Sequence, residues 1–588
     1  MKHLSIFLLL VAFPGGIEAT QYIIEMTDVP KQARSARRAQ ALRELEQRRA
    51  HVQEATSATL DTLIVDVDDR DLYAIATLPS TKRIYRSLEY RPASATVDAA
   101  QSVTQAWEKI GGWEKAGEGV RIAILDTGID STHPAFQMRA ASAPEGFPRA
   151  DRAANLRWTN AKVIVARSYE NLNRQYGAAF GTEARDVHGH GTASAMIAAG
   201  VPHESPQGTL AGVAPRAYVG NYKVLGDASA GSTAGVLKAI DDAVSDGMQV
   251  LNLSLGSGLA ARPEDDVIVQ ALERAIAQGV VVVVAAGNTG TGLNSISSPG
   301  TAPNAITVGS HSAATGLVTW FSGKGPNNGA GLKPDLLAVG DNFFTADSTL
   351  RPGSTGYRTL AGTSLSTPVV AGMTAVVAAL RPGLSPAEYR SLIINAAAPI
   401  TGRALETGAG RADLARSIDA TVTATPSYLR ADSASVSLSG SAAGCLAEVE
   451  GTGLEAWVSG THLEARFAAR AEGWVTVRCV GAPPVRIPFW HSAGETAAAE
   501  GITLLDAPRS AVRNSIVEFG VRLVDVSGTA MPGLPQVTVA SGNAQVQGVT
   551  PMRDVAGAIA VRVRIGSGDN VIRLSAGPVE REVRIQGQ

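Results

Sequence analysis

The sequence predicts an α/β domain with a mostly parallel sheet, preceded by a small α+β unit and followed by all-β modules. Three observations support this prediction. From about residue 101 to 420, apolar β-branched runs alternate with helical segments, which is typical of a parallel sheet covered by helices. Before residue 92, two strand-like runs flank a charged helical stretch. After residue 420, alternating strands are separated by Gly, Ser and Pro turns.

Length and composition exclude several classes of protein. The 588 residues are too many for one hydrophobic core, and 45% hydrophobic with 18% charged residues is typical of a chain that folds. Lys and Arg total 52 against 54 Asp and Glu, and no long basic block is present. We therefore expect no nucleic-acid partner.

The N-terminus has the pattern of an export signal. Lys2 and His3 precede an apolar run over residues 4–13, followed by Pro14-Gly15-Gly16 and the small residue Ala19. We predict a signal peptide over residues 1–19, since the run is too short to cross a bilayer; a buried helix is the alternative. No later stretch reaches 18 uninterrupted apolar residues. We expect no membrane span and a secreted, periplasmic or cell-envelope location.

The middle region supplies the elements of the predicted sheet. Residues 137–181 are predicted to form a surface loop. Predicted strands span residues 120–125, 218–225, 249–254, 280–284 and 305–308, and predicted helices span 234–246, 265–278, 364–380 and 385–397.

The C-terminal region divides into two β-sandwich-like modules, predicted over residues 420–491 and 500–588, with a small-residue linker between them. The first module contains the chain's two cysteines, Cys445 and Cys479. We predict that they form a disulfide, because export exposes them to an oxidising environment and adjacent strands can bring them together. Two separate buried thiols are the alternative.

Two polar patterns in the middle region lie where α/β sheets expose functional groups. Asp126 directly follows a predicted strand; an Asp that caps a turn is the alternative. His190 lies between two glycines at the start of an apolar helical segment, two residues after His188. A metal cluster of the pattern Asp-x-His-x-His, formed by Asp186, His188 and His190, is a second interpretation, but no further His or Cys ligand set lies nearby in sequence. Simple turn structure is a third.

A third pattern is Gly362-Thr363-Ser364, at the start of a predicted apolar helix. A helix N-cap is the ordinary role of such a serine. The free N–H groups and positive potential at a helix start would also stabilise an oxyanion beside the Ser364 hydroxyl.

The three patterns supply an acid, a base and a nucleophile in the chain order Asp, His, Ser, and the sequence resembles the subtilisin-like serine proteases, the subtilase family. The resemblance implies a subtilisin-like three-layer fold over residues 100–418 and a serine endopeptidase acting on proteins or peptides. It also implies that Asp126 orients the imidazole, His190 acts as general base and then acid, and Ser364 attacks the carbonyl carbon.

The resemblance extends to the substrate site. Asn288 matches the family's oxyanion-hole asparagine, although an Asn before Thr and Gly is also a common turn former. Ser297 is expected near the floor of the main specificity pocket, where the absence of an acid favours apolar P1 residues. Substrate-binding positions implied by the resemblance are Ser254, Leu255, Gly256, Ala286 and Gly287.

The N-terminal α+β unit, residues 20–95, resembles the family's inhibitory propeptide, which is ferredoxin-like and makes the enzyme a zymogen. The precursor is then expected to cut itself between about Arg91 and Gln101. Residues 198–212 lack the Asn-rich loop that binds calcium in many members. We therefore predict no metal site and no cofactor, and leave a calcium requirement open.

Two other functions compete with a peptidase. One is a catalytically silent subtilase-like scaffold that uses its β modules for adhesion, and the other is a metal-dependent hydrolase using His188 and His190. A serine-directed fluorophosphonate would label only the peptidase. A chelator would inhibit only the metal enzyme.

Overall fold

The structure is a computed structural model that describes most of residues 20–588. The chain divides into two compact units, Met1–Pro92 and Ala93–Gln588. The predicted signal peptide, the junction after the N-terminal unit and the linker after residue 492 lie outside the described residues. The residues not described are 1–19, 28, 49, 57–61, 68–70, 72–73, 76, 87–101, 139–141, 174–179, 260–262, 264–265, 291–292, 294, 328–330, 432–433, 493–500, 506, 525–534, 552–557 and 578.

The N-terminal unit contains an antiparallel sheet and the helix α1 (Arg34–Glu46). Leu63 and Val65 alternate on the buried face of a central strand, where they pack with Leu45 of α1. The α+β prediction is confirmed, while the ferredoxin-like assignment stays a prediction. The strands are ordered β2-β3-β1-β4, with bounds β1 (Thr20–Met26), β2 (His51–Thr56), β3 (Thr62–Val67) and β4 (Thr81–Arg86).

The second unit is built on a parallel sheet of eight strands, as the alternating pattern predicts. The predicted surface loop over 137–181 is wrong in part, because its apolar run Val163–Ser168 forms β7 inside the sheet. The strands are ordered β16 (Leu336–Val339), β15 (Ile306–His311), β13 (Val281–Ala285), β11 (Val250–Leu253), β5 (Arg121–Asp126), β10 (Tyr218–Lys223), β7 and β6 (Arg149–Ala150).

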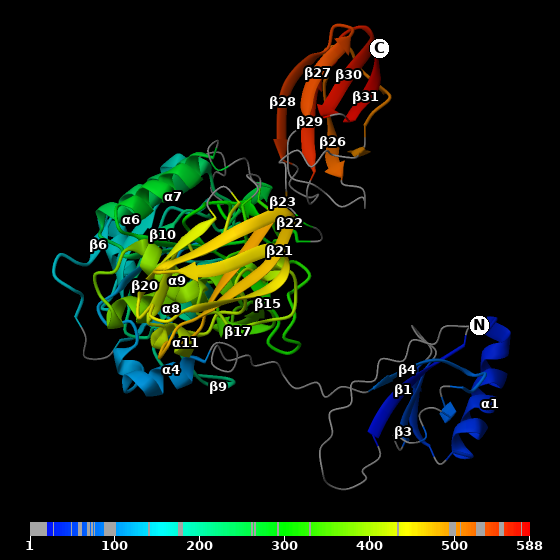
Figure 1. Cartoon of the computed structure of the whole chain (residues 1–588), viewed down its shortest axis with the longest axis horizontal. Helices are drawn as coiled ribbons and strands as arrows, with labels where there is room; N and C mark the ends of the chain where they lie inside the picture. The colour runs from blue at the N-terminus through cyan, green and yellow to red at the C-terminus, as the bar shows by residue number, and fades with distance from the viewer. Residues whose placement is uncertain are drawn as a thin grey trace. The chain divides into compact units, whose positions relative to one another are not determined.

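Helices cover both faces of this sheet, which gives the predicted three layers (Figure 1). Ile122 and Ile124 of β5 belong to one apolar core, while Ala123 and Leu125 belong to the other, since successive residues of a strand face opposite ways. The first core contains α4 (Val103–Ile110), α5 (His190–Ala199), α8 (Thr363–Leu380), α9 (Pro386–Ile394) and α11 (Leu414–Asp419), and the second contains α6 (Thr233–Ser245) and α7 (Val267–Ala277).

Helix α8 is the central helix of the first core. At 18 residues and a mean hydropathy of 1.5, the helix is long and apolar enough to cross a membrane, but 83% of these residues are buried inside the protein. The apolar composition of α8 is therefore accounted for by its packing against α5 and the sheet.

The first C-terminal module forms one antiparallel sheet, in which β22 pairs with β20 near its start and with β23 near its end. Cys445 and Cys479 form a disulfide, as predicted, beside the apolar core of this module. The strands are β19 (Val422–Thr425), β20 (Ser435–Gly440), β21 (Leu446–Ser459), β22 (His462–Arg478) and β23 (Val485–Ser492).

The second C-terminal module has two four-stranded sheets around a single apolar core, which is the predicted sandwich arrangement. One sheet is ordered β24 (Gly501–Leu505), β26 (Ile516–Val524), β29 (Ile559–Arg564) and β28 (Gln545–Pro551). The other is ordered β25 (Ser510–Ala511), β31 (Val579–Gly587), β30 (Gly568–Ala576) and β27 (Gln536–Ser541).

Candidate active site

Four polar residues singled out in the sequence lie at the ends of elements of the parallel sheet domain. Asp126 is the last residue of β5, and Asn288 follows the end of β13 by three positions. His190 is the first residue of α5, and Ser364 is the second residue of α8. The carboxyl ends of parallel strands meet at one edge of a sheet, so this is where an α/β fold places a site.

Asp126 and His190 form a direct pair. The Nδ1 atom of His190 lies 2.7 Å from Oδ1 of Asp126, whose side chain is fully buried, while the imidazole is 20% exposed. Asp126 also accepts hydrogen bonds from the Thr127 N–H at 2.7 Å and the Ser194 hydroxyl at 3.1 Å. The carboxylate is thereby fixed, and it holds the imidazole through one nitrogen while the other ring edge stays accessible.

The surroundings of His190 shift its basicity in opposite directions. Burial lowers the pKa of the imidazole, whereas the charge of Asp126 and its hydrogen bond raise it, and Asp186 adds to the increase. The net result is a pKa above the ordinary value of a histidine. His190 is therefore a stronger base than a free imidazole.

The start of α5 depends on close backbone packing. A Cβ added at Gly191 would overlap the carbonyl oxygen of Gly128, so only glycine lets α5 approach the loop after β5. Asp186 stabilises the helix start, because its carboxylate accepts hydrogen bonds from the N–H groups of Gly189 at 2.8 Å and Thr192 at 2.9 Å. The sequence places Asp186 only in the alternative metal pattern with His188 and His190, so its hydrogen bonds to the start of α5 were not predicted.

Ser364 and Asn288 face a common point beside Gly362. A Cβ added at Gly362 would lie 3.0 Å from the Ser364 Oγ and 3.3 Å from the Asn288 Nδ2. The Asn288 Oδ1 accepts hydrogen bonds from the Thr363 N–H at 2.8 Å and the Thr363 hydroxyl at 2.9 Å. These bonds orient the amide so that its NH₂ group is directed away from Thr363, toward the space beside the serine hydroxyl.

His190 and Ser364 lie at the starts of two packed helices, since α5 contacts α8. Among the described residues, no hydrogen bond joins the Ser364 hydroxyl to His190. Such contacts are often long in a site without substrate and shorten when substrate binds.

The predicted substrate-binding residues fall on two neighbouring segments. Gly256 precedes β12 (Ser257–Leu259), which pairs with β14 (Ser297–Ser298). A Cβ added at Gly256 would lie 3.1 Å from the Ser297 Oγ, and one added at Gly287 would overlap the same atom. Ser297 therefore lies between the segment that contains Ser254, Leu255 and Gly256 and the segment that contains Ala286 and Gly287.

The structure offers little for the metal interpretation of His188 and His190. The rings are tilted with centroids 6.3 Å apart, and Nδ1 of His190 is occupied by Asp126. No group of three or more His, Cys, Asp or Glu side chains suited to a metal ion occurs in the part of the chain that the structure describes.

A parallel α/β domain with a buried carboxylate on an imidazole, and a serine at a helix start beside an asparagine amide, defines the class of serine hydrolases. The profile of the Subtilase family, Peptidase_S8, matches residues 117–420. The chain belongs to this family and is a subtilisin-like serine endopeptidase.

Individual relatives are similar over the same region. Serine protease AprX of Bacillus subtilis (strain 168) is 31% identical over 334 residues, which cover 52% of this chain and 67% of that protein. Subtilisin Savinase of Lederbergia lenta is 35% identical over 282 residues, covering 48% of this chain and 84% of that protein. Among solved structures, a cold adapted subtilisin-like serine proteinase shares 25% identity with a TM-score of 0.36, covering 51% of this chain and 88% of that chain.

Proposed function

We propose that Asp126, His190 and Ser364 are the catalytic triad of this peptidase. The Ser364 hydroxyl attacks the carbonyl carbon of the peptide bond, and His190 takes its proton and then delivers it to the leaving amine. Water releases the resulting acyl group from Ser364, with His190 again as the base. The observation that supports this proposal most is the 2.7 Å contact between His190 and the fully buried Asp126 carboxylate.

Asn288 is proposed to bind the oxyanion together with the Ser364 N–H. The amide is exposed and oriented by Thr363, so it needs no rearrangement when negative charge develops on the carbonyl oxygen. The position of Ser364 at the start of α8 adds the unpaired N–H groups and positive potential of a helix start.

The substrate is proposed to be a protein or peptide that binds in extended form along residues 254–256 and 286–287. The Ser297 hydroxyl lies between these segments, and a serine there would leave a neutral pocket that accepts apolar P1 side chains. Cleavage of a peptide library tests this preference. A dominant basic P1 residue would show that an acid outside this set lines the pocket.

The chain is further proposed to be exported and made as a zymogen. The apolar N-terminal pattern supports export, and the α+β unit between it and the peptidase domain supports an inhibitory propeptide. Self-cleavage would separate the two units between about residues 91 and 101.

Reaction with a fluorophosphonate tests the enzymatic proposal. The secreted protein should be labelled once, on Ser364, and a Ser364→Ala variant should neither react nor remove its propeptide. A wild-type protein that folds but is never labelled would support the catalytically silent scaffold. Normal processing of Ser364→Ala, measured by mass spectrometry, would show that another protease makes the cut.

A further inference from the structure

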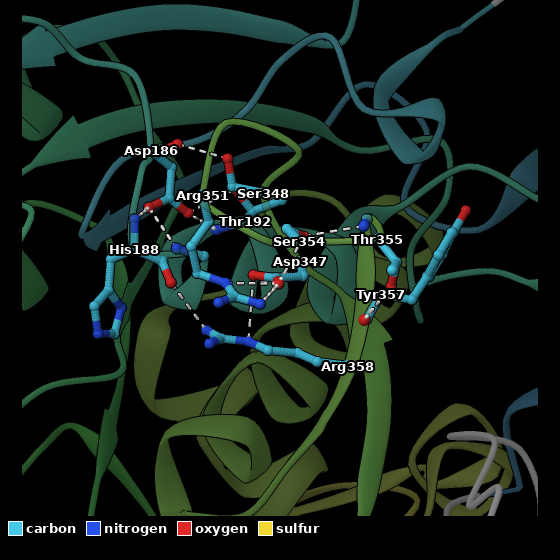
Figure 2. A network of polar contacts seen from close by, with 12 residues as sticks. Asp186, His188, Thr192, Asp347, Ser348, Arg351, Ser354, Thr355, Tyr357 and Arg358 are labelled. Carbon is cyan, nitrogen blue, oxygen red and sulfur yellow. Dashed lines mark hydrogen bonds and ion pairs between the residues drawn. The ribbon is translucent and has the colours of Figure 1, made fainter.

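A hairpin that the sequence analysis did not predict packs against the start of α5. It consists of β17 (Phe343–Ala346) and β18 (Tyr357–Leu360), which pair from Phe343 with Leu360 to Ala346 with Tyr357. Strand β17 contacts α5, and the Ser348 hydroxyl in the connecting loop donates to the carbonyl oxygen of Asp186 at 2.6 Å. Figure 2 shows this polar network from close by.

The polar centre of the hairpin is the carboxylate of Asp347, whose side chain is fully buried. It accepts hydrogen bonds from the Arg351 Nε and the Ser354 hydroxyl, both at 2.8 Å. The Nε of Arg358 lies 3.3 Å from its other oxygen. A buried carboxylate is costly unless it is paired. One oxygen of Asp347 is hydrogen-bonded by Arg351 and Ser354, and the other forms an ion pair with Arg358 without a hydrogen bond.

Arg358 reaches from this carboxylate to the main chain beside the catalytic site. Its Nη2 donates to the carbonyl oxygen of His188 at 3.2 Å, two residues before His190. A Cβ added at Gly189 would overlap Oδ1 of Asp347, so the chain between the two histidines packs directly on the Asp347 carboxylate.

The same short segment is held from its other side by Asp186. The carboxylate of Asp186 accepts the N–H groups of His188 at 2.9 Å and Gly189 at 2.8 Å. In Figure 2 the Asp186 side chain and the Arg358 guanidinium approach His188 from different sides. The N–H groups of the segment thus donate to a carboxylate, and the His188 carbonyl accepts from a guanidinium.

We propose that Arg358, anchored by Asp347, is a positioning residue for His190. It fixes the main chain at His188 and Gly189, so that the imidazole keeps its hydrogen bond with Asp126 and its other nitrogen stays directed toward the serine. This inference rests on the proposed role of His190 as general base.

Arg358 also acts on the imidazole through its charge. The charged and titratable groups facing His190 are Asp126 at the end of β5, Asp186 and His188 in the preceding loop, and Arg358 in β18. Burial lowers the pKa of His190, the two carboxylates raise it, and the guanidinium lowers it. Removal of Arg358 should therefore raise the pKa of His190.

The two effects of Arg358 can be separated, because they change kcat in opposite directions. Loss of a positive charge alone stabilises the imidazolium that forms during catalysis. A fall in kcat on removal of Arg358 therefore reports lost geometry, not lost charge. Misplacement of a catalytic group by about 1 Å costs up to about 10²-fold in rate.

The test compares Arg358→Gln and Arg358→Lys with Arg351→Gln in the full-length, processed enzyme. Arg351 binds the same carboxylate, but among the described residues its side chain makes no hydrogen bond or ion pair with the His188 segment. In Arg358→Gln we expect kcat on a short peptide to fall about 10- to 100-fold with KM unchanged. The acid limb of kcat/KM should move to higher pH.

Arg358→Lys keeps the charge and loses the planar guanidinium, so kcat should fall while the acid limb stays in place. Arg351→Gln should leave both unchanged, and circular dichroism establishes that each variant is folded. The pH dependence of fluorophosphonate labelling gives a second measure of His190 basicity.

Wild-type kcat and an unmoved acid limb in Arg358→Gln would overturn the inference, and so would equal losses in Arg351→Gln. If Arg358→Gln does not fold, Arg358→Lys decides the question, because wild-type kcat in that variant also overturns the inference. Failure of the proposed serine-peptidase function would give a different result, because the fluorophosphonate would then not label the wild-type protein.

Discussion

Two regions of the second unit bring polar groups together, and they use them differently. One is the edge with the proposed triad and oxyanion donor, Asp126, His190, Ser364 and Asn288, which we call the catalytic edge. The other is the contact between the peptidase domain and the first β module, which we call the seam. It comprises Asn395 of the helix C-cap after α9, the turn Gly408–Ala409, and Trp474 and Arg486 of the module.

At the seam the hydrogen-bonding groups are paired. The Asn395 amide donates to the carbonyl oxygens of Ser427 at 2.8 Å and Arg486 at 2.9 Å, and its oxygen accepts from the Ser391 hydroxyl at 2.9 Å. The Trp474 Nε1 donates to the Gly408 carbonyl at 2.7 Å, and the Arg486 guanidinium lies 4.4 Å from the centre of the Trp474 ring. These polar groups therefore have their hydrogen-bond partners within the protein.

At the catalytic edge the pairing is incomplete. Within the described residues, the Ser364 hydroxyl, the Asn288 NH₂ group and the Nε2 of His190 have no protein hydrogen-bond partner, while the other polar atom of His190 and of Asn288 is fixed by a neighbour. A group that is oriented but unpaired is ready to bind a reacting substrate. The comparison predicts that substitutions at the edge change turnover, whereas substitutions at the seam change stability.

The largest effect on turnover is expected for Ser364→Ala. The variant loses the proposed nucleophile, and we expect kcat to fall on the order of 10⁶-fold, the size of the loss found in subtilisin. Ser366→Ala is a matched control, because its hydroxyl lies in the same helix but donates to the Ala338 carbonyl at 3.1 Å. That control should lose some stability and keep its kcat. Equal losses in both variants would place catalysis elsewhere.

Asn288→Ala should have the next largest effect. It removes one donor to the oxyanion, which costs about 10²–10³-fold in kcat in subtilisin. The control is Asn304→Ala, since Asn304 is also exposed and is not part of the catalytic edge. Its amide donates to the Glu273 carboxylate at 2.7 Å. An unchanged kcat in Asn288→Ala would remove this residue from the proposed oxyanion site.

Acidification should stop turnover before it unfolds the protein. The pKa of His190 is raised, so its base form, and with it kcat/KM, is lost about tenfold per pH unit starting above pH ~6.5. Buried His311 behaves in the opposite way, because burial lowers its pKa to about 4. The unfolded chain then binds the extra proton, so stability falls only as pH drops from ~6.5 toward 4.

Rate profiles and thermal unfolding across this pH range check that order. His133 and His203 contribute in the same direction as His311, because burial also lowers the pKa of both imidazoles. Loss of the folded state at a higher pH than loss of turnover would contradict the prediction.

The sequence predicted the positions of the four residues at the catalytic edge better than the contacts that hold them. Asp126, His190, Asn288 and Ser364 each lie in a short motif just after a strand or at the start of a helix, so local pattern predicted where they lie, while their catalytic roles stay predictions. The strand Val163–Ser168 was not predicted, because it lies within the stretch 137–181 and no predicted helix flanks it in the sequence.

The contacts that hold the catalytic edge and the seam in place were not predicted, for a different reason. Arg358 and His188 are 170 residues apart, and Trp474 and Gly408 are 66 apart, so no local pattern links the partners. The sequence around a single arginine or tryptophan in a strand does not indicate which distant residue it will contact. Such contacts exist only once the sheet has brought distant segments together.

The smallest effect on turnover, and a large one on stability, is expected for Arg486→Ala at the seam. Arg486 is 6% exposed, and its guanidinium donates to the Ala409 carbonyl at 3.0 Å and to Glu450 at 2.8 Å. Loss of these bonds and of the Trp474 contact should cost about 2–3 kcal/mol. None of these partners belongs to the catalytic edge, so kcat of the folded protein should not change.

Arg478→Ala is the matched control for this prediction. It removes an arginine from β22 of the same module, but Arg478 pairs with Glu448 where both side chains are more than half exposed, so its loss should cost little. Thermal unfolding is best compared in the Ser364→Ala background, where self-digestion cannot confuse the result. If Arg486→Ala unfolds at the same temperature as Arg478→Ala, the seam adds no stability. If instead the folded Arg486→Ala enzyme loses kcat, the module supports the catalytic edge, and the division between the two regions fails.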